Sequence, residues 1–176
     1  WSSDVCSSDL FGGNPCEMDK IYKLSLKYGF NICEDASHAL GASFRKEPIG
    51  NCAYSNAVVF SFHPVKMITT GEGGALIVKT KDDYKKATTL RSHGIPEDRS
   101  DLSEMGMPDW YYEQISLGYN YRLSDLQAAL GVSQLERLKS FVEIRNELAL
   151  EYHKLLKGFP FKLQKITYKC ISSYHL

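Results

Sequence analysis

The chain has 176 residues, of which 43% are hydrophobic and 24% are charged, and its 21 Lys and Arg balance its 21 Asp and Glu. This composition is that of a globular domain, and a neutral chain lacks the positive field that attracts nucleic acid or an anionic membrane surface. The longest apolar run, at residues 57–60, is far shorter than the roughly 20 residues of a membrane span. The five cysteines form no C-x-x-C pair, so we expect reduced thiols in a cytoplasmic protein and no metal site.

The two ends of the sequence differ from the rest. Residues 1–10 begin with Trp1 and contain Ser-Ser-Asp twice, without the periodicity of a helix or a strand. We therefore expect residues 1–10 to be a non-native leader, and we predict no part of the fold from them. Residues 158–176 stop within a pattern, and we interpret the chain as an internal piece of a longer protein.

Helices and short apolar strands alternate along the sequence. Asn14, Pro15 and Glu17 predict the start of a helix, and Gly29 predicts its end. Apolar runs predict strands at residues 30–35, 56–62 and 74–79, and a helix is expected at 82–92. This alternation predicts an α/β fold.

A long helix is expected after these elements. Ser124 and Gln127 have the spacing of a capping box, and apolar residues then recur at helical spacing as far as Leu156. A helix of about 33 residues would be about 50 Å long. We expect residues 123–157 to form one helix that links two domains or subunits.

Two positions suit cofactor chemistry. Asp35 ends a predicted strand, where open α/β sheets bind their ligands, and His38 follows three residues later. Lys66 follows the next strand, after Pro64 has ended the pairing. A neutral lysine amine can bond covalently to an aldehyde cofactor. Taken singly, Asp35 is better explained as a surface carboxylate or helix cap, and Lys66 as an exposed loop lysine.

Three other segments could indicate other functions, but each indication is weaker. The glycine-rich turn at 69–74 matches neither a dinucleotide-binding fingerprint nor a Walker A loop. The aromatic residues at 110–122 could stack on bases, but the neutral charge favours an interface. A hydrolase triad of Ser61, His63 and Asp35 is disfavoured, because Ser61 has no G-x-S-x-G surroundings.

Five ordered motifs are similar to those of one family. They are EDASHALGA at 34–42, FSFHPVK at 60–66, TGEGGA at 70–75, LRSHGI at 90–95 and LGYNYR at 117–122. Over residues 11–176 the chain resembles the DegT/DnrJ/StrS sugar aminotransferases, which depend on pyridoxal 5′-phosphate (PLP). The resemblance implies part of the large domain of a fold-type I aminotransferase, with a mixed sheet and flanking helices. Residues 11–122 would belong to that PLP-binding domain, and 158–176 would begin a truncated small domain.

The resemblance also implies roles for single residues. Lys66 matches the lysine that bonds to the cofactor and carries protons between cofactor and sugar. Asp35 matches the carboxylate that faces the pyridine nitrogen, and His38 matches a contact to the ring. Ser61 matches the hydroxyl that holds the phosphate.

Two further residues would act across a subunit boundary. Asn120 matches an amide that reaches the cofactor phosphate of the neighbouring subunit, and Arg122 matches a residue near the nucleotide diphosphate. These matches imply a homodimer with shared active sites.

The motifs at 62–66, 110–114 and 117–122 are most similar to the branch of the family in pseudaminic acid biosynthesis. That similarity implies amino transfer from glutamate to C4 of a UDP-linked 4-keto-6-deoxy sugar. Another nucleotide-linked 4-keto sugar is the main alternative. The dehydratase branch has histidine in place of Lys66, and a non-catalytic relative would have lost Asp35 or Lys66. The family's N-terminal phosphate loop does not occur in the sequence, so we expect the isolated chain to be inactive and to bind PLP poorly.

Overall fold

The computed structural model describes residues 5–104 and 106–176, apart from the side chain of Cys6. Their contacts divide the chain into two compact units. Unit 1 contains the described residues up to Ile77 together with Asp125–Leu176, and unit 2 is Val78–Ser124. Each unit is described by itself.

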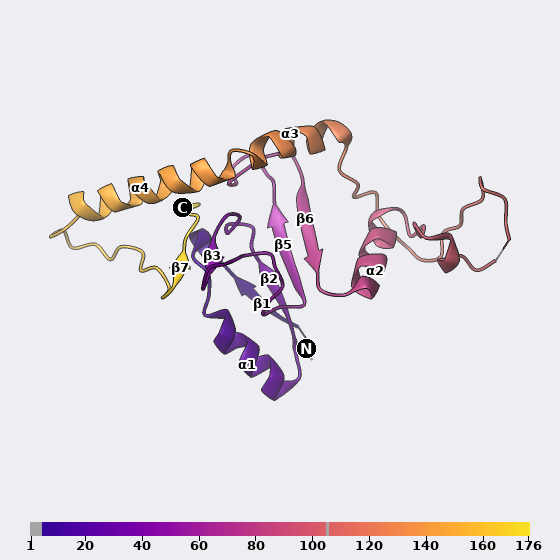
Figure 1. Cartoon of the computed structure of the whole chain (residues 1–176), viewed down its shortest axis with the longest axis horizontal. Coiled ribbons are helices and arrows are strands. Elements are labelled where there is room, and N and C mark those ends of the chain that lie inside the picture. Colours follow the sequence, from indigo (N-terminus) through magenta and orange to yellow (C-terminus); the bar gives the residue numbers. More distant parts are fainter. Residues whose placement is uncertain (1–4, 105) are drawn as a thin grey trace. The chain divides into compact units, whose positions relative to one another are not determined.

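The main sheet of unit 1 has four strands in the order β1-β2-β5-β6. Their bounds are Val5–Asp9 for β1, Asn31–Asp35 for β2, Ala57–Ser61 for β5 and Gly74–Val78 for β6. Strands β1, β2 and β5 are parallel, and Figure 1 shows β6 running opposite to β5. The three strands predicted from apolar runs are therefore present, and the predicted mixed sheet is confirmed.

Strand β1 corrects the expectation that the first ten residues take no part in the fold. Val5 pairs with Asn31 and Asp9 pairs with Asp35, and the side chain of Leu10 is fully buried. Parallel pairing uses main-chain groups, so a strand can form at the side of the sheet without apolar alternation in its sequence. Residues 1–4 lie outside the described part of the chain.

Helix α1 (Met18–Tyr28) ends as predicted but begins later than predicted. At its end Gly29 has a φ of 72° and donates its N–H to Ser25 O at 2.8 Å, which is a left-handed cap suited to glycine. The predicted cap by Asn14 is wrong. Asn14 instead donates from its side-chain amide to Lys165 O at 3.1 Å and accepts from Thr167 N at 3.1 Å.

A small second sheet joins distant parts of unit 1. It contains β4 (Glu47–Pro48), β3 (Ser43–Phe44) and β7 (Cys170–Ile171) in that order, all antiparallel. Strands of two residues are too short to leave a periodic pattern in the sequence. The hydrophobic core lies between the two sheets and α1 and includes the buried residues Leu10, Met18, Ile32, Phe44, Val58 and Phe60.

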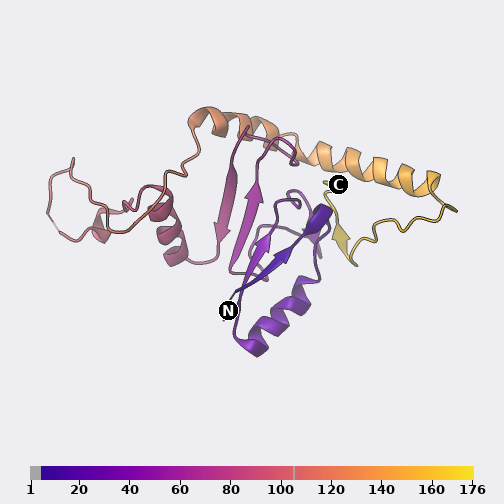
Figure 2. The ribbon, with the colours of Figure 1, turned by 180° about the vertical axis from the view of Figure 1, so that it is seen from behind.

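The prediction of a single 33-residue helix is wrong, because the structure has two consecutive helices in this region. Helix α3 is Asp125–Leu135 and helix α4 is Leu138–Leu155. At the break, Arg137 N donates to Gln134 O at 3.1 Å, a tighter turn than that of an α-helix. Figures 1 and 2 show the two helices following one another across one end of the main sheet. The apolar periodicity continues through the break and gave no sign of it.

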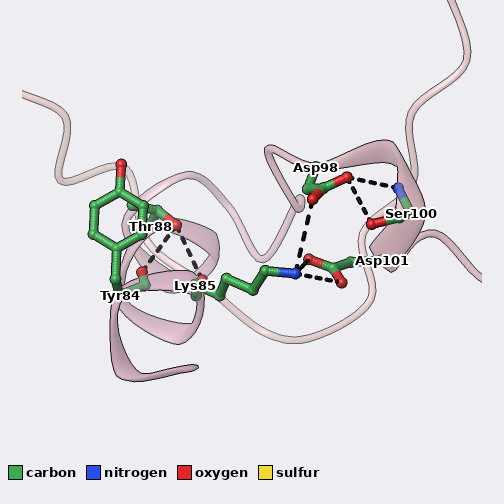
Figure 3. A network of polar contacts seen from close by, with 6 residues as sticks. All are labelled: Tyr84, Lys85, Thr88, Asp98, Ser100 and Asp101. Carbon is green, nitrogen blue, oxygen red and sulfur yellow. Dashed lines mark hydrogen bonds and ion pairs between the residues drawn. The ribbon is translucent and has the colours of Figure 1, made fainter. Parts of the chain in front are cut away.

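Unit 2 is organised around α2 (Lys81–Arg91) and a short 3-10 helix at Arg99–Asp101. Thr80 caps α2 by accepting from Asp83 N at 3.1 Å, so the predicted helix at 82–92 is confirmed with a shift of one residue. Figure 3 shows Lys85 of α2 pointing toward Asp98 and Asp101, at N···O distances of 3.8 Å and 3.0 Å. Among the described residues, no helix is both long and apolar enough to cross a bilayer.

Candidate active site

Asp35 is the last residue of β2, and its main chain is held on both sides. Leu10 N donates to Asp35 O at 3.1 Å, and Ala36 N donates to Val59 O on β5 at 2.9 Å. The side chain turns back on the next residues, so that Ser37 N donates to Asp35 Oδ1 at 3.0 Å. The carboxylate is therefore fixed at the carboxyl end of the strand, as the sequence predicts.

The surroundings of Asp35 favour its charged form. Hydrogen bonding from Ser37 lowers the pKa of the Asp35 carboxyl, and the positive charges of His38 and Lys66 lower it further, although partial burial opposes them. Donors and cations stabilise a carboxylate relative to the neutral acid. Asp35 is thus ionised at neutral pH and can face a cationic group.

Lys66 lies on a loop that closes on itself directly after β5. Phe62 N donates to Gly73 O at 2.8 Å, and Thr70 N donates to Phe62 O at 3.0 Å. Within the loop, Lys66 N donates to His63 O at 2.9 Å, and the half-buried Lys66 interacts electrostatically with Asp35. Strands β2 and β5 are neighbouring and parallel, so their carboxyl ends lie at the same edge of the sheet. Asp35 ends β2, and Lys66 lies on the loop that leaves β5 at this edge.

Ser61 and His38 complete the predicted set in unit 1. Ser61 is the half-buried last residue of β5, and its Oγ accepts from His63 N at 3.4 Å. His38 accepts from Gly12 N through Nδ1 at 3.3 Å. A main-chain N–H can only donate, so in its neutral form the His38 ring carries its proton on Nε2 and can donate from there.

His175 was not predicted from the sequence. Its ring lies 4.4 Å from the His38 ring, between centroids, and it is nearly buried, with 9% of its surface exposed. Burial and the positive charges of His38, Lys66 and Arg145 lower the pKa of His175 to about 4. Its Nδ1 is buried without a hydrogen-bond partner among the described residues. No spacing in the sequence links these two histidines.

The polar segment that carries His175 is held by two distant parts of unit 1. His175 N donates to Gly12 O and Ser173 N donates to Gly13 O, both at 3.1 Å. From α4, Arg145 Nη1 donates to Tyr174 O at 2.9 Å. These bonds place the His175 ring against the His38 ring.

Asn120 and Arg122 belong to unit 2, and both are exposed. Asn120 forms an isolated antiparallel bridge with Ser92, and beside it His93 N donates to Tyr119 O at 2.8 Å. Two of the five sequence motifs therefore lie side by side. The roles predicted for Asn120 and Arg122 across a subunit boundary remain predictions.

The sequence was compared with protein families and curated proteins. The model of the DegT/DnrJ/EryC1/StrS aminotransferase family matches residues 7–175. A UDP-4-amino-4,6-dideoxy-N-acetyl-beta-L-altrosamine transaminase of Campylobacter jejuni is 44% identical over 167 residues, which are 94% of this chain and 42% of that protein. The Helicobacter pylori transaminase of the same name is 34% identical, over 86% of this chain and 37% of that protein.

Solved structures with a similar fold belong to aminotransferases as well. Helicobacter pylori PseC, an aminotransferase involved in the biosynthesis of pseudoaminic acid, superposes with a TM-score of 0.82 at 33% identity. The match covers 96% of this chain and 43% of that one. The sugar aminotransferase Spr1654 of Streptococcus pneumoniae, in its PMP form, gives a TM-score of 0.82 at 25% identity and is covered to 47%.

The chain therefore spans less than half the length of the relatives that it matches. The fold is part of a fold-type I aminotransferase, as the sequence predicts. Both the motifs and the fold place the chain in the DegT/DnrJ/EryC1/StrS aminotransferase family.

Proposed function

We propose that this chain supplies catalytic residues to a PLP-dependent transaminase of nucleotide sugars. The reaction would move an amino group from glutamate to C4 of a UDP-linked 4-keto-6-deoxy sugar, in pseudaminic acid biosynthesis. The observation that carries the proposal is the placement of Lys66, on its closed loop after β5, close enough to the ionised Asp35 at the end of the neighbouring strand β2 to lower the pKa of its carboxyl. The name and the 44% identity of the Campylobacter jejuni relative support the choice of sugar.

The described residues fit PLP by their chemistry. Lys66 offers the amine that bonds to the aldehyde carbon, and Asp35 offers a carboxylate to the pyridine nitrogen. His38 can donate from Nε2 to an oxygen on the ring, and the Ser61 hydroxyl can donate to the phosphate. When bound, PLP supplies an electron sink for the carbon that loses its proton.

The residues of the chain would then perform three tasks. Asp35 stays charged and keeps a proton on the ring nitrogen, through a charge-assisted hydrogen bond. Lys66 Nζ would hold a proton and move it between two carbon atoms. His38 fixes the ring, because Gly12 N and the His175 ring hold its own orientation.

We also propose that the complete protein works as a homodimer. Asn120 would reach the cofactor phosphate of the partner, and Arg122 would approach the nucleotide diphosphate there. Both side chains are exposed on unit 2, which leaves them available to a second subunit. Charge-assisted contacts of arginine suit a diphosphate.

The test replaces the matching part of the Campylobacter jejuni relative with residues 11–176, so that the relative supplies the remaining chain. We expect the purified chimera to bind PLP and to transfer the amino group of glutamate to the UDP-linked 4-keto sugar. Other nucleotide-linked 4-keto sugars, assayed in parallel, test the main alternative. A folded, dimeric chimera that neither binds PLP nor transfers the amino group would refute the proposal.

A further inference from the structure

We infer that helix α3 positions the Lys66 loop, through the side chain of Gln127 and the absence of a side chain at Gly131. Both would be positioning residues, since they act on the lysine through the loop that carries it. The inference rests on the proposed function, which makes Lys66 the lysine that bonds to PLP. That α3 holds the loop in place can be tested without PLP.

The loop after β5 is closed by its own hydrogen bonds. Its two ends meet at Phe62, whose N–H donates to Gly73 O and whose carbonyl accepts from Thr70 N. Inside the loop, Thr70 Oγ1 donates to Glu72 O at 2.8 Å. The position of Lys66 therefore depends on how Thr70 and Glu72 are held.

Helix α3 reaches this loop with a hydrogen bond. Gln127 Nε2, in the first turn of α3, donates to Glu72 O at 2.8 Å. The carbonyl of Glu72 thus accepts both from Thr70 within the loop and from Gln127 on the helix. This bond ties the loop to an element far away in the sequence.

Gly131 lets the helix approach the loop closely. It lies four residues after Gln127, so both face the same side of the helix. Gly131 is the buried residue of α3, and a Cβ added there would lie 2.9 Å from Thr70 Cγ2. Thr70 is itself buried, at 3% exposure. Alanine at 131 would therefore push against the residue whose N–H closes the loop.

Both contacts affect the position of the Lys66 amine. A reacting amine must be held close to its target in a favourable geometry, and small displacements lower the rate strongly. A helix that anchors Glu72 and contacts Thr70 restrains both residues on which the closed loop depends. Neither Gln127 nor Gly131 needs to touch the cofactor for this effect.

The first experiment measures backbone hydrogen exchange in the 176-residue chain by mass spectrometry. Gln127→Glu keeps the size of the side chain but removes the amide donor, and Gln134→Glu makes the same change two turns along the same helix. We expect exchange of peptides covering residues 62–74 to be about fivefold faster in Gln127→Glu, the factor for one lost neutral hydrogen bond. Peptides covering β2 and α1 should be unchanged, as should all peptides of Gln134→Glu.

Gly131→Ala is the independent second variant. Alanine raises helix propensity, so weaker helix formation cannot explain faster exchange in the loop. We expect the same peptides to exchange faster. Unchanged loop exchange in both variants would overturn the inference. So would a loss of protection throughout unit 1 in both, because the two residues would then support the whole unit and not the loop.

The second experiment connects the loop to the lysine. The chimera described above is incubated with PLP and reduced with borohydride, and labelled lysines are identified by peptide mapping over pH 6 to 9. We expect Lys66 to be labelled in preference to Lys79 in the parent chimera and in its Gln134→Glu variant. That preference should fall, and its pH profile should shift, in Gln127→Glu and Gly131→Ala.

The outcomes separate the two proposals. If the loop exchange changes but Lys66 is never preferred in the parent chimera, the proposed function fails at this lysine while the structural part of the inference stands. If Lys66 is preferred and its labelling is the same in all variants, the inference is wrong and the proposed function is unaffected.

Discussion

The imidazole rings of His38 and His175 lie 4.4 Å apart between centroids and are tilted by 31°. They come from opposite parts of the sequence, and Arg145 and Lys66 add positive charge near His175. Two histidines so placed cannot both be protonated without repulsion. The structure therefore favours the neutral form of His175, whose pKa is lowered to about 4 by burial and by these charges.

This arrangement predicts a pH dependence of stability. The unfolded chain takes up a proton on His175 near its ordinary pKa of 6.5, whereas the folded chain does so only near 4. Between these two values the unfolded state binds more protons, so the free energy of unfolding falls as the pH falls from 6.5 to 4. We expect a contribution of about 1–2 kcal/mol, since solvent screening reduces the full effect of the shift.

His175→Phe keeps a ring at this position and removes the titration. Urea unfolding of the chain between pH 4 and 7.5 should show a shallower loss of stability in this variant than in the parent. His153→Phe, on an exposed part of α4, is the control and should keep the parent slope. Equal slopes for all three proteins would contradict the prediction.

Lys66→Ala in the chimera should abolish transamination. The substitution removes the amine that would bond to PLP, so the visible absorbance of the bound cofactor should disappear as well. Absorption spectra and the amino-transfer assay measure the two effects. Lys79→Ala serves as the control, and a Lys66→Ala protein that keeps both signals would show that another lysine has this role.

Asp35→Asn should leave the cofactor absorbance in place but slow turnover by about 10- to 100-fold. A neutral amide cannot hold the proton on the ring nitrogen, and a charge-assisted hydrogen bond of about 1.5–3 kcal/mol is lost. Steady-state kinetics should show the loss in kcat. Turnover equal to that of the parent chimera would place Asp35 outside the reaction.

A buried pair on the other face of β2 should contribute to stability. Ser55 Oγ donates to Glu34 Oε1 at 2.5 Å, and both residues are buried. Burial raises the pKa of the Glu34 carboxyl, while the bond from Ser55 lowers it. Ser55→Ala leaves the carboxyl without this donor and should cost about 1–3 kcal/mol.

The cost of Ser55→Ala should grow as the pH rises above the raised pKa that Glu34 has in the folded parent chain. Burial already makes the folded parent hold the proton on Glu34 more tightly than the unfolded state does, and loss of the serine donor raises this pKa further. The variant therefore loses more stability than the parent when Glu34 is deprotonated. Urea unfolding at pH 5 and pH 8 measures the difference. The exposed Ser133→Ala on α3 is the control, and an equal cost for both variants would refute the role of the pair.

The 176-residue chain should self-associate in solution. Helix α4 exposes an apolar stripe at helical spacing, formed by Ile144, Leu148, Tyr152 and Leu155, each at least half exposed. Leu148→Lys should shift the chain toward a monomer in size-exclusion chromatography with light scattering. Lys139→Glu, a charge change outside the stripe, should not. A parent chain that is already monomeric at micromolar concentration would contradict this prediction.

The sequence predicted the parts of the fold that depend on local patterns. The strands ending at Asp35 and Ser61 followed from apolar runs, and the stop of α1 followed from Gly29. The same local logic placed Asp35 and Lys66 at neighbouring strand ends. Their assignment to PLP came from five motifs in a fixed order, which is a resemblance and not a consequence of spacing.

The parts that could not be predicted depend on partners far away in the chain. Asn14 had the local signature of a cap, but its side chain bonds to residues beyond 160. Gln127 had the signature of a capping box, and its contact with Glu72 is visible only in the folded chain. His175 lies in a polar run without periodicity, so its place beside His38 is visible only in the folded chain.

The bonds from His175 and Ser173 to Gly12 and Gly13 also impose an order of events during synthesis. The first helix and the main sheet can form from the early part of the chain, but the His38 ring acquires its neighbour only after residue 175 has been added. Contacts between such distant positions form late and slowly compared with local ones. The pairing of β1, β2 and β5 needs no residue beyond Ser61, whereas the orientation of the His38 ring also depends on residues 173 to 175.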